Sequence, residues 1–131
     1  MNKRLSLTVA TAVVLLSACA TMHKDNAANL TVVEKVTINA PAAKVWAKVG
    51  NFGDLGAFHP AVAKTEIKSG TNNSKGAVRL LTLGDGGTVN ETLTNYDVAG
   101  MSYSYIITES VLPVSHYSAT IDVNPVSANV T

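Results

Sequence analysis

The sequence lacks several features that would narrow its function. Cys19 is the only cysteine among 131 residues, so no disulfide can form within the chain. Charged residues make up 15% of the chain, and no basic patch with interleaved aromatics occurs, which argues against a nucleic-acid partner. The sequence has no His/Cys/Asp cluster at metal-ligand spacing, no glycine loop leading into a helix to hold phosphate, and no Gly-x-Ser-x-Gly elbow. It therefore predicts no metal and no cofactor.

The N-terminus has the pattern of an export signal. Residues 2–4 form a short positive region, and residues 5–16 form an apolar run too short to span a bilayer. Leu16–Cys19 resembles the lipobox of bacterial lipoproteins, which predicts acylation of Cys19 and attachment to a membrane surface. The alternative is an ordinary secretory signal cut near this point. Ala20 after the cysteine resembles lipoproteins that are sorted to the outer membrane, in cells that have one.

Length and composition indicate one folded domain after this signal. Apolar residues make up 47% of the chain, as in globular proteins. We expect a lipoprotein signal peptide over residues 1–19, a polar tether over residues 20–29 and a folded domain over residues 30–131. The expected location is therefore outside the cytoplasm, on the periplasmic side of a membrane.

The start of the domain predicts a short amphipathic helix. Pro41 suits a first helical position, and Gly50 ends the helix. Between them an apolar stripe recurs at helical spacing, formed by Ala42, Val45, Trp46 and Val49. Residues 51–57 contain too many glycines for a second long helix and predict a short helix or a turn.

Alternating apolar and polar residues predict a series of β-strands in the rest of the domain. The expected strands cover residues 30–39, 61–69, 77–83, 88–96, 101–110 and 115–123, with the start of another at 127–131. Short turn-rich connections favour an antiparallel meander, and the fold class is α+β. One short helix cannot cover a sheet of this length. The fold must therefore close on itself, recruit a partner, or belong to a shortened gene product.

Taken in order, these segments resemble the START-like superfamily, also called SRPBCC, and in particular its polyketide-cyclase-type members. The resemblance runs over residues 30–124. Its shared segments are Val36–Ile38, Ala40–Trp46, Phe52–Leu55, Phe58–Pro60, Gly76–Arg79, Gly86–Glu91, Tyr103–Tyr105, Leu112–Val114 and Tyr117. The chain is similar also to an exported branch that assists methanol oxidation. The resemblance implies a helix-grip fold, in which a curved antiparallel sheet wraps a long C-terminal helix around an apolar cavity. This sequence departs from that pattern because it ends before the last strand and the helix.

Arg79 and Glu91 are the first candidates for a functional pair. They flank the reversal at residues 84–87, and the loop length decides whether they meet. A two- or four-residue loop places them on opposite faces of the sheet, whereas a three- or five-residue loop places them directly across from each other. Glu91 shares its face with Val89 and Leu93, so its carboxylate needs a partner. The pair either anchors a ligand head group in the cavity or fixes the strand register as a structural ion pair.

A histidine and three tyrosines complete the candidates for ligand contact. His59 either lines the mouth of the cavity, where it could act as acid, base or donor, or braces the corner between helix and strand. Tyr103 and Tyr105 share one strand face, and Tyr117 lies on the last complete strand. Tyrosine hydroxyls in an apolar cavity orient ligands, although tyrosines on strands also serve plain packing.

These residues lead to three functional hypotheses. The first is a membrane-tethered protein that holds a small apolar or amphipathic ligand through His59, Arg79, Glu91 and the three tyrosines. The second is a cyclase- or hydratase-like enzyme in which His59 or Glu91 performs acid–base work. The third is an accessory protein of a periplasmic oxidoreductase, which acts through its surface on a protein partner. The sequence favours binding over catalysis because no complete acid–base constellation is visible.

Overall fold

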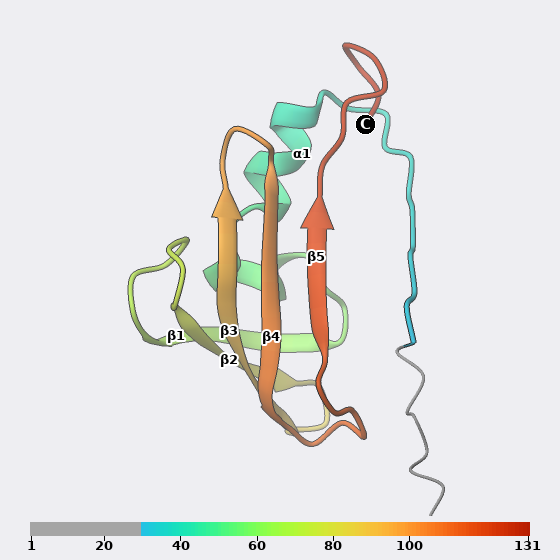
Figure 1. Cartoon of the computed structure of the whole chain (residues 1–131). Coiled ribbons are helices and arrows are strands. Elements are labelled where there is room, and N and C mark those ends of the chain that lie inside the picture. Colours follow the sequence, from blue (N-terminus) through green and yellow to red (C-terminus); the bar gives the residue numbers. More distant parts are fainter. Residues whose placement is uncertain (1–29) are drawn as a thin grey trace, which may run out of the picture. The chain divides into compact units, whose positions relative to one another are not determined.

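The described part of the chain forms one antiparallel sheet and two short helical segments, one near an end of the strands and the other behind the sheet (Figure 1). The computed structural model describes residues 30–131, so the predicted signal peptide, its acylation site Cys19 and the tether lie outside the described residues. Residues 35–131 form a single compact unit. None of the helices in the described part is long and apolar enough to cross a membrane.

The helical segments follow the predicted pattern. Helix α1 spans Ala42–Val49, and the 3-10 segment η1 spans Phe52–Ala57. Pro41 lies one position earlier than expected, because its ψ of 141° makes it the residue before the first helical turn. Gly50 ends α1 as predicted, and its N–H donates to the Trp46 carbonyl oxygen at 2.7 Å.

Five strands follow, and each pairs with the next along the chain. They are β1 (Val62–Ser69), β2 (Val78–Leu83), β3 (Thr88–Asp97), β4 (Ser102–Ser110) and β5 (Ser118–Asp122), in the spatial order β1-β2-β3-β4-β5. This arrangement confirms the predicted antiparallel meander. The last strand is shorter than expected, since it begins only after the exposed residues 111–117.

The first predicted strand is wrong. No residue of 30–39 belongs to a strand, although Val36 and Ile38 alternate with polar residues as a strand requires. A strand needs a hydrogen-bonded neighbour along its length, and this segment is paired only at Ile38, whose N–H and C=O bond Thr131 at 2.8 and 2.9 Å. Val36 is consequently 78% exposed. The strand expected to start at residue 127 is also absent, because Ser127 and Val130 pair with each other across a tight turn.

The buried face of the sheet is divided into two apolar clusters. One cluster contains Phe52 at the start of η1, together with Ala77, Leu93 and Tyr103, and Trp46 of α1 packs against it. The other cluster contains Leu55, farther along η1, together with Val62, Leu81 and Val89 of the sheet. No long helix lies over this face within residues 30–131, so the second cluster borders open space.

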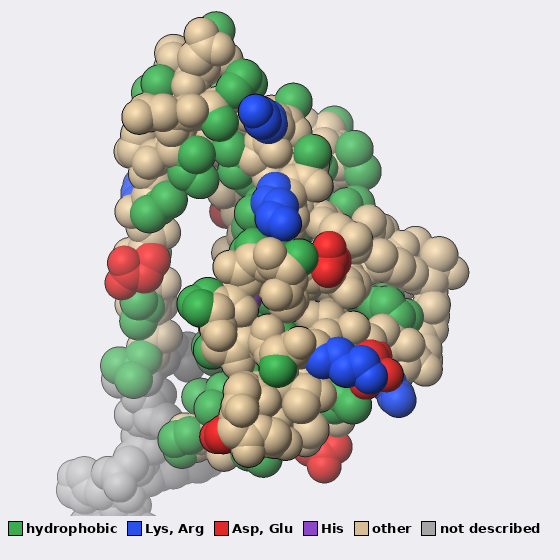
Figure 2. Space-filling model, turned by 180° about the vertical axis from the view of Figure 1, so that it is seen from behind, with side chains coloured by type: hydrophobic (Ala, Val, Ile, Leu, Met, Phe, Trp, Pro, Cys, Tyr) green, Lys and Arg blue, Asp and Glu red, His purple; other side chains and the backbone are tan. Residues whose placement is uncertain are grey.

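Charged side chains are scattered over the outside. Figure 2 shows Lys, Arg, Asp and Glu side chains spread over one face of the molecule, without a patch of a single sign. Lys64 and Glu66 form an exposed ion pair at 3.1 Å. No group of three His, Cys, Asp or Glu side chains in the described part of the chain is arranged to hold a metal ion.

Candidate functional site

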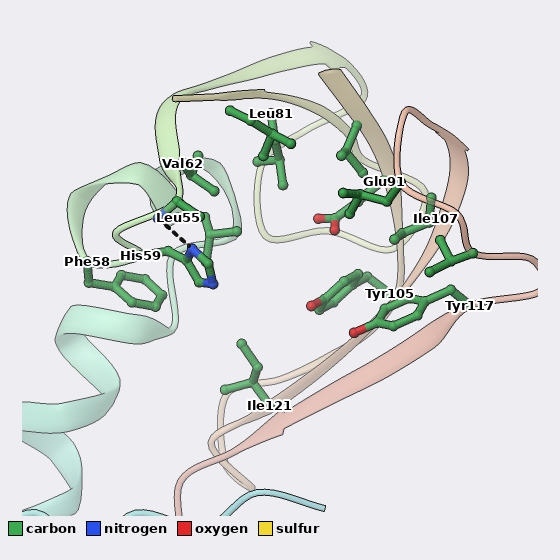
Figure 3. A pocket seen from close by; sticks show the side chains of 15 residues that line it. Leu55, Phe58, His59, Val62, Leu81, Glu91, Tyr105, Ile107, Tyr117 and Ile121 are labelled. Carbon is green, nitrogen blue, oxygen red and sulfur yellow. Dashed lines mark hydrogen bonds between the residues drawn. The ribbon is translucent and has the colours of Figure 1, made fainter. Parts of the chain in front are cut away.

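A pocket of about 330 Å³ lies between η1 and the buried face of the sheet. Apolar side chains make up most of its wall, among them Leu55, Phe58, Val62, Leu81, Leu83, Val89, Ile107 and Ile121. Four residues bring polar atoms to it: His59, Glu91, Tyr105 and Tyr117. Figure 3 shows the Glu91 carboxylate and both tyrosine hydroxyls directed toward the same space, with the His59 ring on the opposite side. A mostly apolar cavity with a few convergent polar groups is typical of sites for small organic ligands.

The hairpin between β2 and β3 decides which residues face this pocket. The Leu83 N–H donates to the Gly87 carbonyl oxygen at 2.8 Å, which leaves a three-residue loop, 84–86. Gly86 has a φ of +88°, the left-handed conformation that such a loop requires. Arg79 therefore pairs directly with Glu91. This is the register predicted for a three- or five-residue loop.

Arg79 and Glu91 form a buried ion pair. The Arg79 side chain has no exposed surface and that of Glu91 is 5% exposed. Arg79 Nε donates to Glu91 Oε2 at 2.6 Å, and Nη2 lies 2.6 Å from the same oxygen without the geometry of a hydrogen bond. Nη1 donates to the Phe52 carbonyl oxygen at 2.7 Å, and the guanidinium carbon lies 4.1 Å from the centre of the Phe52 ring. The pair thus joins the sheet to the start of η1.

Burial and Arg79 act in opposite directions on the Glu91 carboxyl. Burial raises the pKa of Glu91 above its ordinary value of 4.5, and the Arg79 charge and hydrogen bond offset part of that rise. Both Arg79 interactions go to Oε2, and no group among the described residues hydrogen bonds Oε1. One carboxyl oxygen of Glu91 is therefore free on the pocket side.

His59 combines the two predicted roles at the edge of the pocket. Its Nδ1 accepts a hydrogen bond from the Ala61 N–H at 3.3 Å, which braces the turn between η1 and β1. In the neutral imidazole this bond places the proton on Nε2, on the other side of the ring, which faces the pocket in Figure 3. His59 is thus an exposed hydrogen-bond donor at the rim.

The three tyrosines have different places. Tyr105 and Tyr117 line the pocket, and Tyr117 is 40% exposed at the rim. Burial, together with the nearby Glu91 charge, raises the pKa of Tyr105 well above 10, so its hydroxyl stays protonated. Tyr103 is completely buried against Phe52 in the other apolar cluster.

Two of the six predicted contact residues do not reach the pocket surface. Arg79 lies behind Glu91, sandwiched between Phe52 and Tyr105, and Tyr103 lies under the helical end of the sheet. The sequence suggests Arg79 as the nearest partner for Glu91, and Tyr103 because it shares a strand face with Tyr105. The structure buries both side chains completely. The sequence does not show which part of the buried face of the sheet is covered by α1 and the start of η1, and which part borders the pocket. Leu55 and Phe58, which form the wall opposite the sheet, were not among the candidates, although both lie in the glycine-rich segment before His59.

A family model described as "Polyketide cyclase / dehydrase and lipid transport" matches residues 29–131. The chain belongs to this family. This confirms the SRPBCC, START-like assignment and the α+β class of its helix-grip fold, with the long C-terminal helix absent from residues 30–131.

Solved structures of related proteins support the family assignment. The protein XoxI from Bacillus cereus is 28% identical, with a TM-score of 0.66, and the match covers 72% of this chain and 64% of that protein. An uncharacterized protein from Bacillus thuringiensis is 27% identical with a TM-score of 0.63, over 72% of this chain and 66% of that one. A protein from Thermobifida fusca is 26% identical with a TM-score of 0.66, over 72% of this chain and 63% of that one. The chain thus spans slightly less than two thirds of each of these three proteins. No curated protein matches the sequence significantly.

Proposed function

We propose that the protein binds a small hydrophobic or amphipathic ligand in the pocket under η1. The observation that carries this proposal is a cavity of about 330 Å³ whose mostly apolar wall carries four convergent polar groups. The volume lies within the range of pockets that hold small organic molecules. The family description, which includes lipid transport, supports an apolar ligand.

Native mass spectrometry of the full chain tests this proposal. The chain should carry Cys19→Ser, so that no acyl group attached to the protein can enter the pocket. We expect additional bound mass that organic extraction releases as an apolar compound. Leu81→Trp, which fills the pocket from β2, should lose the bound mass, whereas the exposed Val98→Trp should retain it. Equal ligand retention by the two folded variants would contradict binding at this site.

We propose further that the protein is exported and held at a membrane by acylation of Cys19. The support is the sequence before Cys19, which combines a basic start, a short apolar run and a lipobox-like end. Metabolic labelling with radioactive palmitate should mark the wild-type chain in the membrane fraction. Cys19→Ser should abolish the label and release the protein from the membrane. Membrane retention without label would favour an uncleaved signal as the anchor.

A second candidate function is a cyclase- or hydratase-like enzyme. The observation in its favour is that His59 and Glu91 face each other across one pocket, as a proton donor and a proton acceptor (Figure 3). The compound released in the experiment above should then change in mass on incubation with the protein. His59→Ala should abolish this turnover while the compound still binds. If the wild-type chain does not convert the compound, the enzyme proposal fails.

A further inference from the structure

The polar end of the pocket contains one oxygen that requires a partner from the ligand. Glu91 Oε2 receives the Nε hydrogen of Arg79 and lies 2.6 Å from Nη2, whereas Oε1 is unbonded among the described residues. The Glu91 side chain is 5% exposed, so little water reaches it once the pocket is filled. Once a ligand displaces water from the pocket, a carboxylate oxygen without a hydrogen bond is costly, and a ligand that supplies the missing hydrogen removes that cost.

The charge of Arg79 determines the form of Glu91 that a ligand meets at neutral pH. The guanidinium remains charged at every ordinary pH, and its side chain has no exposed surface. Protonation of Glu91 would leave this buried charge without its counter-charge, and the Arg79 charge and hydrogen bond offset part of the rise that burial causes in the pKa of Glu91. Oε1 is therefore the oxygen of a carboxylate and can only accept hydrogen bonds.

The other polar groups around Oε1 suit a hydroxyl. Tyr105 and Tyr117 direct O–H groups into the same space, and His59 presents its second ring nitrogen from the opposite side (Figure 3). A ligand hydroxyl can donate its hydrogen to Oε1 and accept one from a tyrosine or from His59. A ligand carboxylate would approach Glu91 as a like charge, and Arg79 offers it no attraction at the surface because it lies behind Glu91.

We infer that the ligand is an alcohol or phenol on an apolar body, bound by donation of its hydroxyl hydrogen to Glu91 Oε1, and that the pocket rejects carboxylates. This inference rests on the proposed function, because it names the ligand class of the same pocket. It assigns Glu91 as the residue that determines specificity and Arg79 as the residue that positions it.

Four probes with one apolar body test this inference by isothermal titration calorimetry of the full chain carrying Cys19→Ser. They are 2-naphthol, 2-methoxynaphthalene, naphthalene and 2-naphthoate. We expect 2-naphthol to bind about tenfold or more tighter than 2-methoxynaphthalene, since a hydrogen bond to a charged group contributes at least this factor. The methoxy compound has a similar shape and an acceptor but no hydrogen to donate. The carboxylate should bind weakest of the four at neutral pH.

Two variants assign the preference to Glu91. Glu91→Gln should reduce the preference for 2-naphthol over 2-methoxynaphthalene severalfold and improve 2-naphthoate relative to both. Glu109→Gln is the matched control, because Glu109 is exposed on β4, bonds Asn90 at 3.1 Å and does not line the pocket. It should keep the wild-type order. If Glu91→Gln does not fold, the order of affinities of the four probes for the chain with Glu91 unchanged still tests the inference.

The outcomes separate this inference from the proposed function. If 2-naphthol and 2-methoxynaphthalene bind equally, or if 2-naphthoate binds tightest, the inference is overturned while the pocket remains a binding site. If none of the probes binds, naphthalene included, the proposed function fails and the inference fails with it. If Glu109→Gln changes the order as much as Glu91→Gln, the assignment to Glu91 is overturned.

Discussion

Arg79 carries a full positive charge on a side chain with no exposed surface, and its partner Glu91 is almost as deeply buried. Removal of one member of a buried pair leaves the other charge without compensation and costs about 3–5 kcal/mol. Arg79→Met keeps much of the side-chain volume and removes the charge and its donors. We expect it to lower the free energy of unfolding by about this amount, measured by urea denaturation.

The exposed pair of Lys64 and Glu66 provides the control for this substitution. Its N–O distance is 3.1 Å, but the Lys64 side chain is 63% exposed. Lys64→Met should therefore change the free energy of unfolding by less than about 1 kcal/mol. The double variant Arg79→Met/Glu91→Leu should recover part of the lost stability, since it leaves no unpaired charge. Equal losses for Arg79→Met and Lys64→Met would contradict the buried pair.

The titration of Glu91 makes a separate prediction about pH. Burial raises its folded-state pKa above 4.5, so the folded chain binds this proton more tightly than the unfolded chain. The resulting stability is fully present below pH 4.5 and is lost as the pH rises through the folded-state pKa. The free energy of unfolding of the wild-type protein should therefore decline as the pH rises from 4.5 through the folded-state pKa of Glu91. Glu91→Gln cannot titrate at this position and should not show that decline. Denaturation at several pH values between about 4 and 8 checks this. Parallel curves for the two proteins would show that the pKa of Glu91 is not raised.

Among the elements, the β2–β3 hairpin has the largest influence on the site. Its three-residue loop pairs Arg79 with Glu91 and points both to the buried face. Gly86 holds a φ of +88°, and a Cβ added there would meet no atom within 4 Å. Gly86→Ala should therefore destabilise the protein by about 1 kcal/mol through backbone strain alone.

Gly84 in the same loop is the matched control. A Cβ at Gly84 also meets nothing within 4 Å, and its φ is not in the left-handed region. Gly84→Ala should be neutral or slightly stabilising, because it restricts the unfolded chain without strain in the folded one. Thermal denaturation of the two variants distinguishes them. A loss in Gly84→Ala as large as that in Gly86→Ala would show that space, rather than the backbone angle, limits the loop.

At the level of elements, the sequence predicted what depends on local pattern. The alternation of Val89, Glu91 and Leu93 placed a carboxylate on the apolar face, and all three are buried there. The same pattern could not choose between two loop lengths, because Gly84–Gly87 allows more than one turn. The choice comes from the hydrogen bond between Leu83 and Gly87, which the sequence does not show.

On the scale of the whole molecule, the sequence could not predict which segments cover each part of the sheet. The buried face was correctly predicted along β3 and β4, but its division into a packed half and an open half was not. Tyr103 and Tyr105 are two residues apart on the same face, yet Tyr103 is packed under Phe52 and Tyr105 lines the pocket. The difference arises from the position of η1, which depends on long-range contacts such as the hydrogen bond from Arg79 to the Phe52 carbonyl oxygen.

In the segment before α1 the residue alternation predicts a strand, but within residues 30–131 the structure shows no strand pairing there. Hydrogen exchange of the backbone amides can test which is right. Residues 31–37 alternate as a strand, but none of their amides donates to a backbone carbonyl within the described chain. We expect these amides to exchange at the rate of an unfolded chain, while the Ile38 amide, bonded to Thr131, is slower. Amides in the centre of β3, such as Leu93, bonded to the Ala77 carbonyl oxygen, provide the protected reference. Protection of residues 31–37 that increases with protein concentration would mean that a second copy supplies the missing strand partner. Protection that is independent of concentration would show that the segment pairs within its own chain, as the alternation alone predicts.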